Sequence, residues 1–140
     1  MATKVKLLIG KKGTGKTKTI IESVNKSAEL SNGNVVFISS NTSRYNIDIK
    51  NTIRMIDTSE FKIRTYNEFF GLICGVISSN YDITNIYVDS VFKIAVDDLT
   101  TGLYTFLERL EKVAAQNNVS IVLCLSMSES DAPDFTKKYL

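Results

Sequence analysis

Residues 10–17, close to the start of the chain, have types and spacing that suit the binding of a charged group. They read GKKGTGKT, which is a glycine, four residues of any kind, and then glycine, lysine and threonine. In this pattern the glycines let backbone N–H groups converge on phosphate oxygens, the lysine reaches the terminal phosphates, and the threonine hydroxyl coordinates Mg²⁺. We therefore interpret the segment as a loop that binds the phosphates of a nucleotide. The predicted contacts are Gly10, Lys11, Lys12, Gly13, Thr14, Gly15, Lys16, Thr17 and Lys18.

The flanking sequence supplies the two elements that must position this loop. Residues 4–9 (KVKLLI) form a short apolar run of strand length, and residues 18–28 carry apolar side chains at helical spacing. A helix that begins at the loop points the positive end of its dipole at the same anion. We expect this helix to reach about Leu30, with Gly33 beyond it as a stop signal.

A second candidate for chemistry is Asp89, the acid that ends the apolar run 83–89 (ITNIYVD). In proteins with a phosphate loop, a carboxylate at the tip of a neighbouring strand holds Mg²⁺ through water, because this metal prefers oxygen ligands and keeps part of its hydration shell. We therefore predict Thr17 and Asp89 as the metal-binding residues. Three other acids lie nearby but end no apolar run: Asp82, Asp97 and Asp98.

Two more apolar runs, residues 34–39 (NVVFIS) and 119–125 (VSIVLCL), are typical of buried parallel strands, which are apolar almost throughout. The second run leads into Ser126. Open α/β sheets bind ligands at the carboxyl ends of their strands. Ser126 is therefore added to the predicted nucleotide contacts.

The sequence also predicts the helices between these strands. Thr65 and Glu68 have the spacing of a capping box, and a helix with an apolar face follows them to about Ile77. A strongly amphipathic helix starts at Thr101. The tail, residues 129–140, is expected to pack back as a short helix.

Residues 40–60 are harder to interpret. Isoleucines alternate with polar residues on both sides of Asn51, which suggests an inserted β-hairpin that turns there. Residues 61–65 (FKIRT) alternate like an edge strand. Arg44 and Arg54 are candidates to reach a phosphate or a partner subunit, because arginine suits phosphate recognition.

Composition excludes several classes of function. The chain has 17 basic and 15 acidic residues, so no global field attracts DNA or RNA, and the basic cluster of the loop is accounted for by phosphate. No stretch is apolar enough for a signal peptide or a membrane helix. Two isolated cysteines without any histidine favour buried free thiols over a zinc site or a disulfide framework. We expect one domain, residues 1–140, in the cytoplasm.

With GKKGTGKT, NIYVD and IVLCLS in place, most of the chain resembles the P-loop NTPases of the RecA-like or helicase-like kind. The resemblance implies an α/β fold of three layers, in which a mainly parallel sheet has helices on both faces. It also implies that the Ser126 strand lies between the loop strand and the Asp89 strand, with ATP as ligand and Mg²⁺ as cofactor. The chain is also similar to short P-loop proteins of Firmicutes of uncharacterised function, some labelled as ATPases or twitching-motility proteins.

The residue after Asp89 departs from that pattern. RecA-like ATPases and helicases usually have a glutamate there to activate water, whereas this chain has Ser90. The resemblance therefore implies ATP binding with slow or partner-activated hydrolysis. Candidates for a catalytic role are Glu68, Asp97 and Lys11. Lys11 stands where the MinD and ParA family has the extra lysine of its loop (GKGGxGKT), which acts across a dimer, so a second copy or another protein is a candidate partner.

Two other functions remain open. The order of phosphate loop, residues 42–45 after the second strand, and strand aspartate is similar to the thymidine kinase layout, although the cysteines of that family's zinc-binding domain are missing. The other alternative is a nucleotide-dependent binding module without turnover, whose partner docks on residues 91–96 or on the predicted hairpin. A phosphorylated nucleoside as product would favour the kinase, and an inert bound nucleotide would favour the module.

Overall fold

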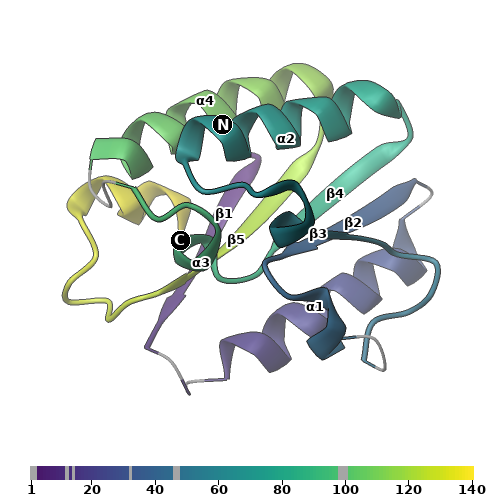
Figure 1. Cartoon of the computed structure of the whole chain (residues 1–140), viewed down its shortest axis with the longest axis horizontal. Helices are drawn as coiled ribbons and strands as arrows, with labels where there is room; N and C mark the ends of the chain where they lie inside the picture. The colour runs from purple at the N-terminus through teal and green to yellow at the C-terminus, as the bar shows by residue number, and fades with distance from the viewer. Residues whose placement is uncertain (1–2, 12, 14, 32, 46–47, 98–100) are drawn as a thin grey trace.

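The computed structural model describes residues 3–11, 13, 15–31, 33–45, 48–97 and 101–140. In these residues five strands form one sheet in the order β1-β5-β4-β2-β3, and every neighbouring pair is parallel (Figure 1). The strands are β1 (Val5–Gly10), β2 (Asn34–Ser39), β3 (Arg54–Asp57), β4 (Ile83–Val88) and β5 (Ser120–Ser126). The α/β class and the place of the Ser126 strand between the loop strand and the Asp89 strand are therefore confirmed.

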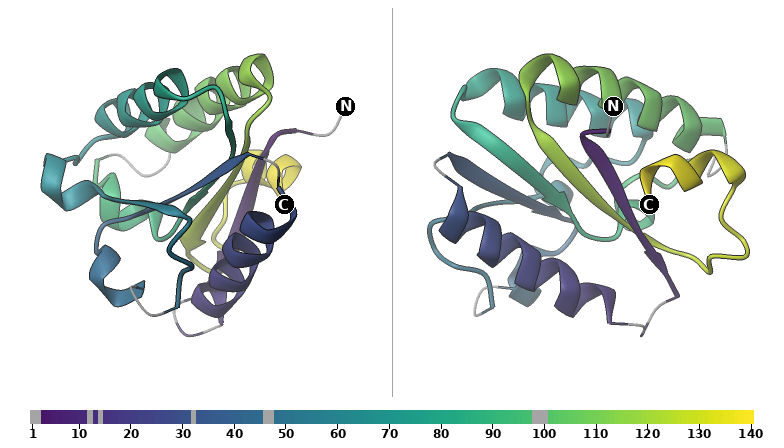
Figure 2. Two further views of the ribbon diagram at one scale, coloured as in Figure 1. Left: turned by 90° about the vertical axis from the view of Figure 1, so that its right-hand side faces the viewer. Right: turned by 180° about the vertical axis from the view of Figure 1, so that it is seen from behind.

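Helices lie on both faces of this sheet and complete three layers (Figure 2). One face carries α1 (Lys16–Leu30), and the opposite face carries α2 (Tyr66–Ser79) and α4 (Thr101–Asn117), which lie side by side. The described residues also form four shorter helices. Three lie in connections, η1 (Thr42–Tyr45), η2 (Thr58–Phe61) and α3 (Val91–Ile94), and η3 (Asp134–Tyr139) follows β5. No helix in the described part of the chain is both long and apolar enough to cross a membrane.

The face covered by α2 and α4 holds the larger apolar core. Phe106 of α4 stacks on Phe69 of α2 with ring centroids 5.4 Å apart, and Tyr66 lies 5.2 Å from Phe106 on its other side. Tyr139 of η3 is also buried in this core, so the tail packs back as a short helix, as expected. The predicted capping box is confirmed, because the Thr65 hydroxyl accepts the Glu68 N–H while the Glu68 carboxylate accepts the Thr65 N–H.

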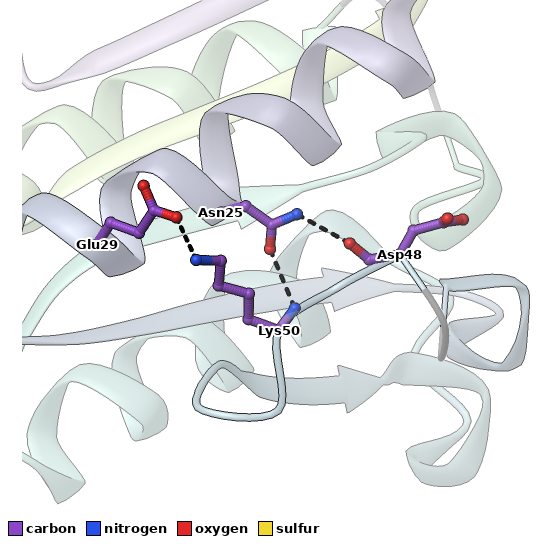
Figure 3. A network of polar contacts seen from close by, with 4 residues as sticks. All are labelled: Asn25, Glu29, Asp48 and Lys50. Atoms are coloured by element: carbon purple, nitrogen blue, oxygen red, sulfur yellow. Dashed lines mark hydrogen bonds and ion pairs between the residues drawn. The ribbon is translucent and has the colours of Figure 1, made fainter.

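The α1 face has a smaller apolar cluster and is completed by a loop. Figure 3 shows how residues 48–50 are tied to α1. The Asn25 amide donates to the Asp48 carbonyl (2.8 Å) and accepts the Lys50 N–H (3.0 Å), and the Lys50 ammonium pairs with Glu29. The Asn25 side chain thus pairs with backbone groups of Asp48 and Lys50, as a neighbouring strand would do in a sheet.

The prediction of an inserted hairpin is wrong for this segment. Residues 48–53 form turns, and β3 runs parallel to β2 at the edge of the sheet. Ile49 and Ile53 lie in these turns, and their side chains are buried in the apolar cluster on the α1 face. The apolar spacing that suggested a strand therefore has another cause. Ile47, on which the prediction also relied, lies outside the described residues.

Two smaller predictions are also corrected. Residues 61–65 form no edge strand. Helix η2 extends to Phe61, and Lys62, which caps this helix, has a left-handed backbone conformation (φ 54°) that a strand does not adopt. Helix α1 ends at Leu30, as predicted, but the residue that caps it is the extended Ser31 and not Gly33. Glycine is required at position 33 for another reason, since a Cβ there would lie 2.3 Å from the Asp82 carbonyl oxygen.

Candidate functional site

The predicted phosphate loop has the backbone form that its sequence implies. Strand β1 ends at Gly10, and α1 begins at Lys16. Gly13 and Gly15 both lie in the left-handed region (φ 88° and 89°), which other residues rarely adopt, and the space where their side chains would stand is open. Lys12 and Thr14 lie outside the described residues. The loop therefore presents bare backbone at the N-terminus of a 15-residue helix, which is a geometry that suits an anion.

Lys16 folds back over this loop. Its ammonium donates a hydrogen bond to the Lys11 carbonyl at 2.9 Å. The neighbouring Thr17 side chain is exposed in the first turn of α1. A neutral carbonyl is a weaker partner for an ammonium than a phosphate oxygen is, because charge-assisted hydrogen bonds are stronger. Lys16 is thus held at the loop in a position from which an anion can recruit it.

Asp89 directly follows β4 and is buried, with 4% of its surface exposed. Its N–H donates to the Ile38 carbonyl at 3.0 Å, so the backbone stays tied to β2 beyond the end of β4. Its carboxylate accepts a hydrogen bond from the Tyr45 hydroxyl. A buried carboxylate needs such partners, because burial without them is costly.

Tyr45 contacts the predicted site residue Asp89 and is not among the residues that the sequence predicted for the site. It lies at the end of η1, is 2% exposed, and packs edge-on against Phe37 of β2 with ring centroids 5.0 Å apart. The two bonded residues, Tyr45 and Asp89, are 44 positions apart. The available signal was a tyrosine six positions after β2, in the segment noted above for its likeness to thymidine kinases.

The thiol of Cys124, in β5, is influenced by the charges of two predicted site residues, Asp89 and Lys16. Burial and, to a smaller extent, the negative charge of Asp89 raise the pKa of this thiol, the positive charge of Lys16 opposes both, and the resulting pKa is about 12. Both charges therefore act on a side chain in the strand between β1 and β4. Lys16 and Asp89 therefore both lie close enough to Cys124 to influence its thiol, which makes them parts of one candidate site.

The remaining predicted residues are distributed differently. Ser126 ends β5, is exposed, and is registered opposite Gly10, so it borders the loop. Lys11 and Lys18 have exposed side chains at the loop and in the first turn of α1. Arg54 is the first residue of β3 and pairs in register with Val36, which places it toward the amino end of that strand, away from the carboxyl edge. The side chain of Arg44 lies outside the described part of the chain.

The two acidic candidates for activating water are engaged elsewhere. The Glu68 carboxylate accepts the N–H groups of Arg64 (2.8 Å) and Thr65 (3.1 Å), and these hydrogen bonds lower its pKa. The Asp97 carboxylate accepts the Tyr66 N–H at 3.1 Å. Both side chains thus satisfy backbone donors at the start of α2, the usual role of acids at a helix N-terminus.

The residues present fit a triphosphate with Mg²⁺. The open left-handed glycines leave room for phosphate against the backbone. Thr17 and Asp89 supply oxygen donors, which are the ligands that Mg²⁺ prefers. The described residues contain no group of three or more histidine, cysteine or acidic side chains that could hold a metal. A metal would therefore take its other ligands from phosphate and water, as is usual for Mg²⁺.

The parallel sheet, its strand order and the helices on both of its faces define an α/β fold of the RecA-like kind. Among solved structures, the flagellar accessory protein FlaH from Methanocaldococcus jannaschii is similar, with a TM-score of 0.60 at 13% identity. The match covers 98% of this chain and 66% of FlaH, so the chain spans slightly less than two thirds of that protein. No family model and no curated protein matches the sequence. The resemblance to short Firmicutes proteins stays a prediction.

Proposed function

We propose that the protein binds Mg·ATP at residues 10–17 and hydrolyses it slowly, or rapidly only with a partner. The observation that carries this proposal is the loop itself, in which left-handed Gly13 and Gly15 lead into the N-terminus of α1. The RecA-like fold supports it, because ligands of open α/β sheets bind at the strand carboxyl ends, where this loop lies.

Each residue then has a definite role. Loop N–H groups and the start of α1 bind the phosphates, and Lys16 exchanges the Lys11 carbonyl for a phosphate oxygen. The Thr17 hydroxyl and the Asp89 carboxylate hold the metal site. Bound Mg²⁺ would supply positive charge beside the phosphate oxygens. Tyr45 positions Asp89 through its hydroxyl.

Slow turnover is proposed because the described part of the chain offers no evident group to activate water. Ser90 stands where a glutamate would be expected, and Glu68 and Asp97 accept backbone N–H groups of α2. Phosphoryl transfer depends on positioning and on extra positive charge, often from an arginine supplied by a partner. A second copy or another protein could supply that charge, or the chain could act as a nucleotide-dependent binding module without turnover.

A steady-state assay separates these outcomes. We expect the isolated protein to hydrolyse ATP at well below about 1 s⁻¹, the low end for typical enzymes. A rate that rises with protein concentration would support activation by a second copy, and no phosphate release at all would support the binding module. Accumulation of a phosphorylated nucleoside when nucleosides are supplied would instead identify a kinase. Turnover of several per second that is independent of protein concentration would contradict the proposal.

Calorimetry of Lys16→Ala tests the binding site itself. Loss of one charge-assisted hydrogen bond is worth roughly 1.5–3 kcal/mol, so the affinity for Mg·ATP should fall about tenfold or more. Lys26→Ala is a matched control, because Lys26 is an exposed lysine of the same helix beyond the loop. Asp89→Ala should reduce the gain in affinity that Mg²⁺ gives and leave metal-free binding close to that of the unmodified protein. Equal Mg·ATP affinity for Lys16→Ala and Lys26→Ala would show that the loop is not the site.

A further inference from the structure

A second pocket opens at the carboxyl edge of the sheet, on the far side of Asp89 from the phosphate loop. It has a volume of about 280 Å³ and is lined by residues that follow β2, β3 and β4. Ser40 comes after β2, Ser59 after β3, and Lys93 and Ile94 belong to α3, which follows β4 closely (Figure 1). In the sheet, β5 lies between β1 and β4. The loop at residues 10–17 follows β1, whereas the pocket is lined by residues that follow β4, β2 and β3, so the two are separate.

Among the described residues, three cationic side chains and no acidic one line this pocket: Lys62, Arg64 and Lys93. All three are exposed, and the ion pairs found in the described part of the chain involve other residues. Three acids in the neighbouring segments already accept hydrogen bonds. Glu68 accepts the N–H groups of Arg64 and Thr65, Asp57 accepts from Thr42 and Ser59, and Asp97 accepts the Tyr66 N–H. The positive charge of Arg64 is the weakest of the causes that lower the pKa of Glu68.

Backbone hydrogen bonds hold the segments that carry these cations. The Val96 N–H donates to the Arg64 carbonyl at 2.8 Å, which joins the segment after α3 to the segment before α2. The Lys93 N–H donates to the Ser90 carbonyl at 3.0 Å. A site with fixed walls loses less conformational freedom when it binds, so three like charges on such walls favour a multiply charged anion.

The rest of the lining consists of three hydroxyl side chains, Ser40, Thr58 and Ser59, and three apolar ones. Ile63 and Ile94 contribute to it, and the Val96 side chain is 63% exposed at its rim. A ligand with an apolar or aromatic body beside its anionic group would cover this surface. The volume of about 280 Å³ is close to the low end of small-molecule sites, roughly 300–1,000 Å³.

We propose that this pocket binds a small organic phosphate monoester, of the size of a mononucleotide, through Lys62, Arg64 and Lys93. Arg64 is suited to pair with two phosphate oxygens at once, and the two lysines act as point charges. The ligand's body lies against Ile94 and Val96. This site is additional to the proposed ATP site and does not depend on it, since the two share no lining residue.

An NMR titration of the full chain with AMP tests this site, with inorganic phosphate as a second probe. Because AMP can also enter the phosphate loop, the titration is run on the unmodified protein and on Lys16→Ala. We expect the amides of residues 62–64 and 93–96 to shift in both proteins, with AMP binding more tightly than phosphate. Lys93→Ala should weaken AMP binding at these amides about tenfold, the effect of one charge-assisted hydrogen bond. Lys112→Ala, an exposed lysine on α4, should leave it unchanged.

Arg64→Gln provides a second variant in case Lys93→Ala perturbs α3, and unchanged amide spectra elsewhere confirm that each variant is folded. Shifts confined to residues 10–17, or AMP binding at residues 93–96 that neither variant weakens, would overturn the proposal while leaving the ATP site intact. A single-stranded oligonucleotide is the last probe. If it binds here more tightly than AMP, and if its affinity falls with salt as steeply as contacts to several phosphates require, the proposal is overturned in favour of a nucleic acid.

Discussion

The two faces of the sheet are built in different ways. On one face, α2 and α4 lie side by side over the strands (Figure 2), and the rings of Phe69 and Phe106 stack where these helices meet. On the other face, α1 is the only long helix in the described part of the chain, and residues 48–50 are fastened to it by polar contacts (Figure 3). The first face depends mainly on apolar burial, whereas the second combines a smaller apolar cluster with specific hydrogen bonds.

This difference separates stability from the candidate site. Apolar burial is the main favourable contribution to folding and is not directional. Hydrogen bonds fix side chains in direction, and they join Tyr45 to Asp89 on the face that α1 covers. We therefore expect substitutions under α2 and α4 to lower stability, and substitutions on the α1 face to act more strongly on ligand binding.

Phe106→Ala should have the largest effect on stability. Phe106 is 2% exposed and contacts both Phe69 and Tyr66. Its removal leaves a cavity, and such changes cost about 3–5 kcal/mol, a large part of the stability of an ordinary domain. Urea unfolding measures the loss. Tyr104→Ala, an exposed aromatic of the same helix, should cost much less, and equal losses would contradict the picture of a core on this face.

Tyr45→Phe should have an intermediate effect, because it removes one hydroxyl from the α1 face and keeps the ring. The buried Asp89 carboxylate then loses a donor, which costs about 1–3 kcal/mol of unfolding free energy. If Tyr45 positions Asp89 for a metal, the variant should also change the Mg²⁺ dependence of nucleotide affinity by calorimetry, while metal-free affinity stays the same. Tyr81→Phe, which is 99% exposed, is the control. Lost stability with an unaltered Mg²⁺ dependence would limit Tyr45 to a structural role.

Asn25→Ala should lower stability less. The amide of Asn25 makes two hydrogen bonds to backbone groups of residues 48–50, each worth about 0.5–1.5 kcal/mol. Hydrogen exchange of the Lys50 amide should quicken, because its acceptor is removed. Glu29→Ala should have little effect, since its pair with Lys50 is exposed and surface ion pairs contribute little. A larger loss for Glu29→Ala than for Asn25→Ala would reverse this order.

The two thiols give the smallest and most local test. Burial raises the pKa of both, to about 12 for Cys124, where the charge of Asp89 adds to the effect. The reactive form is the thiolate, so at pH 8 the folded protein should be alkylated at the half-buried Cys74 before the buried Cys124. Between pH 7 and 9, well below its pKa, Cys124 should stay slow to react. Mass spectrometry after timed iodoacetamide treatment measures both rates, and early labelling of Cys124 would show that this region opens.

Local sequence determined several elements by itself. The phosphate loop motif and the apolar residues after it predicted α1, because helix contacts repeat every three or four positions. The capping box of Thr65 and Glu68 predicted the start of α2, because these two side chains accept N–H groups that have no partner within the helix. The continuous apolar runs predicted β2, β4 and β5, since central parallel strands are buried on both faces.

Only the tertiary structure decided which distant residues meet. The alternation of apolar and polar residues around Asn51 was compatible with a hairpin. In the structure, Asn25 forms hydrogen bonds to residues 48–50, which lie against α1, and β3 is parallel to β2. The contact between Tyr45 and Asp89 spans 44 positions, and the three cations of the second pocket come from segments about 30 residues apart in the chain. Such contacts follow from the order of strands in the sheet, and no local spacing encodes them. The sequence therefore determined the phosphate loop, and the fold determined what surrounds it.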